Sequence, residues 1–205
     1  MISKIVVQTA KDPIQPYITE KLKKYTSDAW TYMYFNDTDI KDFFNKNPLP
    51  ELPKIEKLFD ELGGAHKADL FRYYFLYVKG GVYIDSDALL THNLDDITKD
   101  YSFFYVKTNE EQAFNGFIGC SPKNEIMYDL LIDAYNVELD QLRSDYHLLC
   151  KNLVRIVKKY KSSTIKEFHE SGGPDDPYIA TVDVAKNKTI LHHYCFTKII
   201  PKDLI

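Results

Sequence analysis

The sequence predicts an α/β fold in which helices flank a mostly parallel central sheet. Short apolar runs of β-prone residues alternate with segments whose apolar residues recur every three or four positions. The chain has 205 residues, 44% of them hydrophobic, which is enough to bury a core and corresponds to one domain spanning residues 1–205. No internal repeat or low-complexity linker divides the chain.

The expected strands are runs rich in β-branched and aromatic residues: Lys4–Gln8, Trp30–Phe35, Val82–Asp85, Tyr101–Val106, Phe114–Cys120 and Thr189–Tyr194. The expected helices show 3–4 spacing of apolar residues: Pro16–Tyr25, Thr38 or Asp39 to Asn45, Ile55–Leu62, Ala65–Lys79, Glu125–Tyr135 and Tyr146–Tyr160. Glycine pairs at Gly63-Gly64 and Gly80-Gly81 end two of these helices, and Ser171–Pro174 forms a loop.

Composition excludes several classes of function. The formal net charge is −4 and the three arginines lie far apart, so the sequence offers no basic stripe for nucleic acid. No segment reaches the roughly 20 apolar residues of a membrane span. Three widely spaced cysteines (Cys120, Cys150 and Cys195) match neither a zinc site nor a disulfide framework, which favours a reducing, cytoplasmic location.

The most informative segment is Gly80–Asp87 (GGVYIDSD), in which two carboxylates follow a short apolar run. Side chains two residues apart in an extended strand point to the same face, so Asp85 and Asp87 direct two negative charges to one place. Mg²⁺ and Mn²⁺ bind carboxylate oxygens and often share them with substrate phosphates. The segment therefore predicts a site for a divalent metal and a diphosphate.

The helix before this segment carries Asp69 and Arg72, three residues apart and hence neighbours on the helix surface. An ordinary helical ion pair would explain that spacing. However, a helix that rises ~1.5 Å per residue and a strand that returns at ~3.3 Å per residue bring Asp69 and Arg72 beside Asp85 and Asp87. A guanidinium beside a metal-bound diphosphate is a planar donor suited to phosphate oxygens.

Together, His66–Tyr73 (HKADLFRY) and Gly80–Asp87 resemble the signature of DxD glycosyltransferases with the GT-A fold, most closely glycosyltransferase family 32. That family has an S/A-D-x-x-R helix followed by G-G-x-Y-x-D-x-D, and the spacing here matches without a gap. Weaker similarity covers Lys4–Thr9, Asn115–Gly119, the Gly173-Pro174 loop and His192–Tyr194. The chain departs from the pattern at Val7, often His in the family, and after Tyr194, where the usual small-Gly-Ser-Trp continuation is missing.

This resemblance implies a GT-A-like fold for nucleotide-diphospho-sugar transfer, and it implies a role in donor or metal binding for each of the residues named below. Asp87 would bind Mn²⁺ or Mg²⁺ directly, and Asp85 would reach the metal through water or hold hydroxyls of the donor. Either His192 or His193 would complete the metal shell, and His193 is favoured. The other donor-binding residues implied by the resemblance are Gln8, Thr9, Asp69, Arg72, Tyr83 and Asn115.

The catalytic set implied in this way is Asp69, Arg72 and Asp85, and the donor expected is a UDP-linked glucose or 6-deoxyhexose. Transfer to a glycan acceptor would retain the anomeric configuration. Asp175 and Asp176 are candidates for acceptor contact, although capping of their own loop explains them better. The short chain suggests a bacterial or viral member, for example from a large algal virus, which would act in the host cytoplasm. The oligomeric state is open.

Two other functions compete. The run Val82–Asp87 also resembles the D-x-D strand of haloacid-dehalogenase-type phosphatases, in which the first aspartate is a nucleophile. That motif usually opens its domain, whereas about 80 residues precede it here. A non-catalytic module that binds sugar nucleotides is the third hypothesis.

Overall fold

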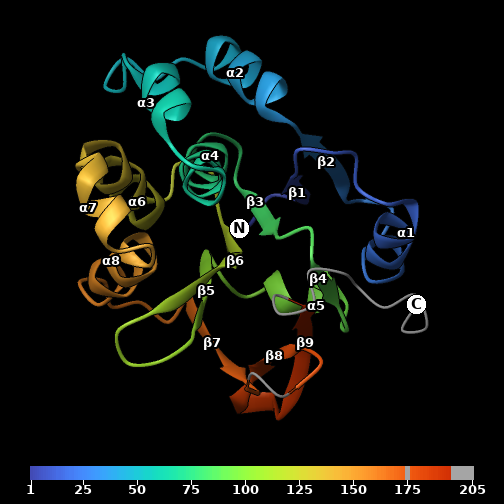
Figure 1. The fold of residues 1–205 in the computed structure, drawn as a ribbon. Helices are drawn as coiled ribbons and strands as arrows, with labels where there is room; N and C mark the ends of the chain where they lie inside the picture. The colour runs from blue at the N-terminus through green and yellow to red at the C-terminus, as the bar shows by residue number, and fades with distance from the viewer. Residues whose placement is uncertain (174–175, 195–205) are drawn as a thin grey trace.

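The structure, a computed structural model, describes residues 1–173 and 176–194 (Figure 1). Its strands form one mixed sheet in the order β2-β1-β3-β6-β5-β7-β8-β9-β4. The strands are β1 (Ile5–Thr9), β2 (Thr31–Phe35), β3 (Gly81–Ile84), β4 (Ala88–Leu90), β5 (Phe103–Lys107), β6 (Ala113–Cys120), β7 (Ile165–Ser171), β8 (Ile179–Asp183) and β9 (Lys188–His193). The helices are α1 (Pro16–Lys24), α2 (Asp37–Lys46), α3 (Ile55–Glu61), α4 (Gly64–Lys79), α5 (Leu94–Thr98), α6 (Glu125–Asn136), α7 (Leu139–Ser144) and α8 (Leu148–Val157).

The α/β class is confirmed, but the prediction of a mostly parallel sheet is wrong. Three strand pairings are parallel and five are antiparallel. Parallel neighbours need a long crossover, usually a helix, whereas antiparallel neighbours need only a turn. Short connections join β5 to β6 and β7 to β8 to β9, so these pairs are antiparallel, whereas β5 and β7, which α6–α8 separate in sequence, pair in parallel.

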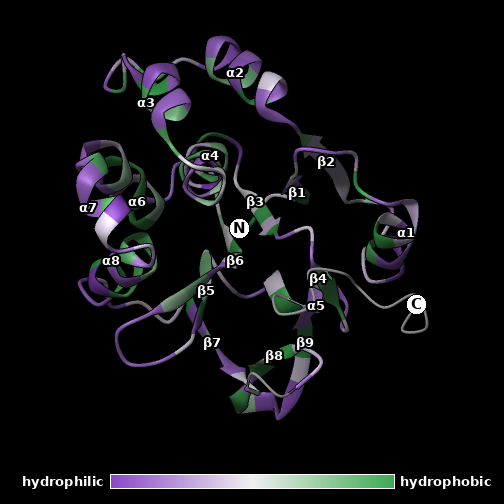
Figure 2. Cartoon of the chain, in the orientation of Figure 1, coloured by the Kyte–Doolittle hydropathy of each residue, from purple (hydrophilic) through white to green (hydrophobic). Residues whose placement is uncertain are grey.

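Successive apolar side chains along the central strands point to opposite faces of the sheet, and each face packs into its own core. Val7, Tyr83 and Ile118 face the larger core, which they share with α2–α4 and α6–α8. Val6 and Val82 face the opposite core, which contains residues from α1, α5, β4 and β9. Since both faces are covered, apolar residues point to both faces of the central strands. In Figure 2, hydrophilic residues lie on the outer side of helices such as α2.

The second half of the sheet curls, so that β9 pairs with β4 immediately after the Asp85–Asp87 turn (Figure 1). Ala88 lies opposite His193 in this antiparallel pair. The curl therefore brings the last described strand to the carboxyl end of β3, where the polar site forms. None of the described helices has the length and apolar character needed to cross a membrane.

Candidate active site

A pocket of about 700 Å³ lies beside the carboxyl end of β3, between α4, β6 and the curled part of the sheet. Its ionisable lining includes Asp69, Arg72, Asp85, Asp87, Cys150, Glu170 and His193. These residues come from α4, α8, β7, β9 and the turn after β3. The site is thus assembled from segments up to 124 residues apart, from Asp69 to His193.

Arg72 links the two acidic groups that the sequence analysis expected near it. Its Nη1 atom lies 3.4 Å from Asp69 Oδ1, and its Nη2 atom lies 3.3 Å from Asp85 Oδ1. Burial acts to lower the pKa of this guanidinium, but Tyr83, Asp85 and Asp69 outweigh it and raise the pKa. Arg72 is therefore a permanent cation at the bottom of the pocket.

Asp69 is buried, and burial raises the pKa of its carboxyl group despite the opposing effect of Arg72. Asn115 Nδ2 donates a hydrogen bond of 3.0 Å to Asp69 Oδ1, and the Tyr73 hydroxyl donates one of 3.0 Å to Asn115 Oδ1. This chain fixes both the Asp69 carboxylate and the orientation of the Asn115 amide. Asn115 thus lies in the pocket with Asp69, on the strand that pairs with β3.

Three of the other expected donor-binding residues lie behind or beside this pocket. The Tyr83 ring lies 4.1 Å beneath the Arg72 guanidinium, and its hydroxyl is 2.8 Å from Thr9 Oγ1. Gln8 is 1% exposed; its Nε2 atom donates to the Asp85 carbonyl at 3.2 Å, and its Oε1 atom accepts from Tyr32. Tyr83 and Gln8 therefore hold Arg72 and the end of β3 in position. Thr9 lines a second pocket, of about 670 Å³, which Lys67 and Ala68 of α4 also line.

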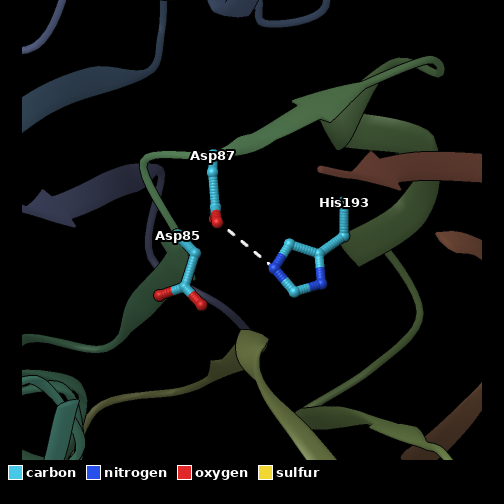
Figure 3. A group of neighbouring side chains, drawn as sticks. All are labelled: Asp85, Asp87 and His193. Atoms are coloured by element: carbon cyan, nitrogen blue, oxygen red, sulfur yellow. Dashed lines mark ion pairs between the residues drawn. The ribbon is translucent and has the colours of Figure 1, made fainter. Parts of the chain in front are cut away.

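Asp85, Asp87 and His193 form a candidate metal centre (Figure 3). One ligand atom from each lies within 4.8 Å of the other two, and His193 Nε2 is 3.4 Å from Asp87 Oδ1. Burial and His193 act in opposite directions on the pKa of Asp87, and the result is a lowered pKa. The same ion pair raises the pKa of His193 against the effect of burial. Two carboxylates and one imidazole are ligands that a divalent transition metal accepts.

The surroundings of these three residues are consistent with a metal centre. His193 is 8% exposed and its ring stacks on Phe114 at 4.2 Å, and its buried Nδ1 has no hydrogen-bond partner among the described residues. Gly116 lies against Asp85, and a Cβ atom at this position would overlap both the Asp85 carboxylate and the Phe114 ring. The absence of a side chain at Gly116 thus leaves space that the Asp85 carboxylate fills.

Adjacent residues of β9 point to opposite faces, and the structure places only His193 beside the aspartates. His192 stacks on Tyr178, with ring centroids 3.8 Å apart. Of the two loop aspartates, Asp175 lies outside the described residues. Asp176 accepts a 2.8 Å hydrogen bond from the Gly173 N–H, which is the loop-capping role.

Several residues of the pocket were missed by the sequence analysis. Tyr146 was expected inside a helix, but α8 begins at Leu148, so Tyr146 lies in the connection from α7 at the rim of the pocket. Glu170 comes from β7, a strand that was not predicted, and burial raises the pKa of its carboxyl group. Helical spacing did mark Cys150 as part of α8, but no local signal showed that its thiol lines the pocket.

The chain is similar in sequence to known glycosyltransferases. Residues 14–104 match the family model described as a glycosyltransferase sugar-binding region containing a DXD motif. An uncharacterized glycosyltransferase of Acanthamoeba polyphaga mimivirus is 31% identical over 125 residues, which cover 55% of this chain and 49% of that protein. Inositol phosphoceramide mannosyltransferase 1 of Schizosaccharomyces pombe is 25% identical over 103 residues, which cover 50% of this chain and 31% of that protein.

The fold is also similar to a solved structure, the PaToxG glycosyltransferase. The TM-score is 0.56 at 13% identity, and the match covers 77% of this chain and 69% of that chain. This likeness shows a shared fold. The chain spans at most about half the length of either curated relative. Together these findings show that the chain is similar to DXD-containing glycosyltransferases, and they support a glycosyltransferase function.

Proposed function

We propose that this chain, which carries the DXD-containing sugar-binding region of glycosyltransferases, is a metal-dependent hexosyl- or deoxyhexosyltransferase. The observation that carries the proposal is the convergence of an Asp85–Asp87–His193 group with the buried Arg72–Asp69 pair in one pocket. One side of the pocket offers ligands for a cation and the other offers a fixed guanidinium. A nucleotide-diphosphate sugar needs both.

The candidate metal is Mn²⁺ in preference to Mg²⁺. Mg²⁺ prefers an all-oxygen shell, whereas Mn²⁺ also accepts imidazole nitrogen, which His193 supplies. When bound, the metal would neutralise negative charge on the diphosphate as the bond from the sugar to the phosphate breaks. Side chains of the pocket bind and orient the donor.

Arg72 donates hydrogen bonds to the diphosphate and stabilises the charge that grows on the leaving group. Asp69 accepts hydrogen bonds from hydroxyls of the donor sugar, and Asn115, which is bonded to Asp69, orients that carboxylate and contacts the donor. Asp85 pairs with Arg72 and is itself one of the three candidate cation ligands, so it joins the two halves of the site. We expect the sugar to be transferred with retention of its anomeric configuration.

The nucleoside, most simply uridine, occupies the second pocket beside Thr9. Ala68 lines that pocket and Asp69 lines the first, so the N-terminal half of α4 separates the two. A diphosphate that crosses this helix turn would join a nucleoside on one side to a sugar on the other. Gln8 and Tyr83 shape this crossing from behind through their contacts to Asp85 and Thr9. The same proposal takes residues 1–205 as one catalytic domain that acts in a cytoplasm on a glycan acceptor.

The test is release of nucleotide diphosphate from a panel of UDP- and GDP-sugars with and without Mn²⁺. We expect Mn²⁺-dependent release from one donor, and at least a hundredfold loss of it in Asp87→Ala because the metal can no longer be held. Asp96→Ala is the matched control, since the Asp96 side chain is 74% exposed and lies 4.0 Å from Lys99 in an exposed ion pair. Unchanged metal-dependent release in Asp87→Ala contradicts the proposed metal site.

The same assay addresses the competing functions. A haloacid-dehalogenase-type phosphatase would use Asp85 as a nucleophile and hydrolyse a generic phosphomonoester without turning over sugar nucleotides. The ion pair from Arg72 to Asp85 and the similarity to glycosyltransferases both favour transfer instead. A non-catalytic module would bind the donor tightly and release no nucleotide diphosphate even when acceptors are supplied.

A further inference from the structure

One side chain of the pocket has no part in the chemistry described so far. Tyr146, in the connection between α7 and α8, lines the pocket and is 63% exposed. Large hydrophobic side chains with this degree of exposure are few in the described part of the chain: the others are Met1 and Val184. An exposed aromatic ring at the edge of a pocket is a feature that ligand sites use, because the ring is apolar on its face and polar at its tip.

The Tyr146 ring is held in place although it is exposed. His66, on the first turn of α4, contacts the Tyr146 carbonyl through Nε2 at 3.2 Å, and the two rings are 5.4 Å apart. On the other side, the His147 N–H donates to Asp145 at 3.1 Å, and Asp145 pairs with Lys151 at 2.7 Å. The contacts from His66 and from Asp145 hold the connection in place. Little conformational entropy is therefore lost when a ligand stacks on Tyr146.

Polar side chains also line the pocket. Glu170, Thr108 and Gln112 come from β7 and the connection between β5 and β6, and they line the same pocket as Tyr146. A carboxylate, a hydroxyl and an amide can together accept hydrogen bonds from hydroxyl groups of a ligand and donate hydrogen bonds to them. An aromatic ring combined with such groups matches a pyranose, which has an apolar face of C–H groups and an edge of hydroxyls.

Depth separates the two substrates. Asp69 and Arg72 are 7% and 4% exposed, so they form the floor of the pocket, whereas Tyr146 lies at its rim. The diphosphate and donor sugar occupy the floor, and the acceptor meets the rim from solvent. We propose that Tyr146 is the platform on which the acceptor stacks, and that the acceptor residue is therefore a pyranose ring. This assignment to the acceptor rests on the proposed glycosyltransferase function; stacking of a pyranose on Tyr146 does not.

The first test measures binding without turnover. Saturation-transfer NMR is recorded with a panel of methyl α- and β-hexopyranosides, in the presence and absence of Mg²⁺ and UDP. We expect wild-type protein and Tyr146→Phe, which keeps the ring, to bind one pyranoside, and Tyr146→Ala to bind it about tenfold more weakly. Equal binding by wild type and Tyr146→Ala, or no pyranoside binding by wild type, overturns the inference.

The second test separates acceptor from donor. With a sugar-nucleotide donor and Mn²⁺, Tyr146→Ala should raise KM for the pyranoside about tenfold and leave donor hydrolysis without acceptor unchanged. A parallel loss of donor hydrolysis would assign Tyr146 to the donor and overturn the inference. Val184→Ala, equally 63% exposed but outside the pocket, is the control for a general surface effect.

The two proposals fail in different ways. If the wild-type protein neither binds UDP nor releases it from any donor, the proposed function fails, while pyranoside binding that depends on Tyr146 would survive without nucleotide. If nucleotide release is metal-dependent but pyranosides do not bind, the inference about Tyr146 fails and the proposed function stands.

Discussion

At the scale of single residues, burial decides what an ion pair contributes. Asp69 and Arg72 lie three positions apart on a helix, and so do Asp140 and Arg143. The exposed pair is the closer one, at 2.7 Å against 3.4 Å, yet its side chains are 90% and 71% exposed, whereas those of Asp69 and Arg72 are 11% and 5% exposed. Solvent screens the exposed pair, and a distance alone would rank the two wrongly.

This contrast gives a prediction about stability. Asp69→Ala leaves Arg72 buried with one partner fewer and Asn115 without an acceptor, so we expect the free energy of unfolding to fall by about 3–5 kcal/mol. Asp140→Ala, with the same spacing, should leave it unchanged within error. Urea unfolding of both variants measures the difference. Equal effects in the two variants would mean that the buried pair is no more than the helical pair that its spacing suggests.

The second prediction at this scale concerns Cys150. Its thiol lines the candidate active-site pocket, but burial raises its pKa to about 12. At pH 8 only about one thiol in ten thousand is then a thiolate, which is the reactive form. We expect iodoacetamide to modify Cys150 about a thousandfold more slowly than the same cysteine in unfolded protein, and the rate to rise about tenfold per pH unit from 8 to 10.

Peptide mapping by mass spectrometry follows Cys150 separately from Cys120, which is fully buried. The urea-unfolded chain is the internal control. If Cys150 reacts in the folded protein as fast as in the unfolded chain, the thiol is not in the environment described here.

At the scale of elements, α4 and β3 were predictable because they are adjacent in sequence. Gly80 and Gly81 have φ angles of 67° and 109°, and added Cβ atoms would overlap Pro122 and the Ile5 carbonyl. Only glycine permits this reversal, and lengths of helix and strand then place Arg72 beside Asp85. The prediction that these two meet is confirmed by their 3.3 Å contact.

The elements that were missed lack such local signals. β7 (IKEFHES) has two apolar residues among seven, Ile165 and Phe168, and they fall on opposite faces of the strand, so neither face shows a hydrophobic pattern. β4 is only three residues long. As a result Glu170 was not recognised as a residue of the site. The predicted helix from Tyr146 also began two residues too early, which hid the exposed position of Tyr146.

β6 carries the third prediction. Gly116 leaves space for the Asp85 carboxylate and for Phe114, which stacks on His193. Gly116→Ala should therefore displace two of the three candidate metal ligands and weaken Mn²⁺ binding at least tenfold, as measured by calorimetry. Gly63→Ala is the matched control, since an added Cβ atom there meets nothing within 4 Å. Normal Mn²⁺ affinity in Gly116→Ala would mean that Asp85 is not held as described.

At the scale of the whole molecule, the curl of the sheet brings the distant residues of the candidate site together. Asp87 and His193 are 106 positions apart, and they meet because β9 pairs with β4. Hydrophobic patterns do not reveal which distant strands pair, so a parallel sheet was expected and the curl was not. The choice of His193 over His192 came from a family resemblance and from the alternation of side chains along a strand. GT-A-type detail beyond the shared α/β fold stays a prediction.

The last prediction follows from this closure. A ligand held by both β9 and the end of β3 stabilises the folded state in which these segments meet, by about 2.7 kcal/mol at a hundredfold excess over Kd. For a chain of this size, we expect Mn²⁺ with UDP to raise the Tm by about 5–10 °C. His193→Ala should lose most of this increase, whereas His192→Ala, its neighbour on the opposite face of β9, should keep it. Differential scanning fluorimetry with and without Mn²⁺ and UDP measures the increase within each variant, so a lower starting Tm does not affect the comparison. A full increase in His193→Ala would show that the cation is held by the turn after β3 alone, and that β9 closes the sheet without binding it.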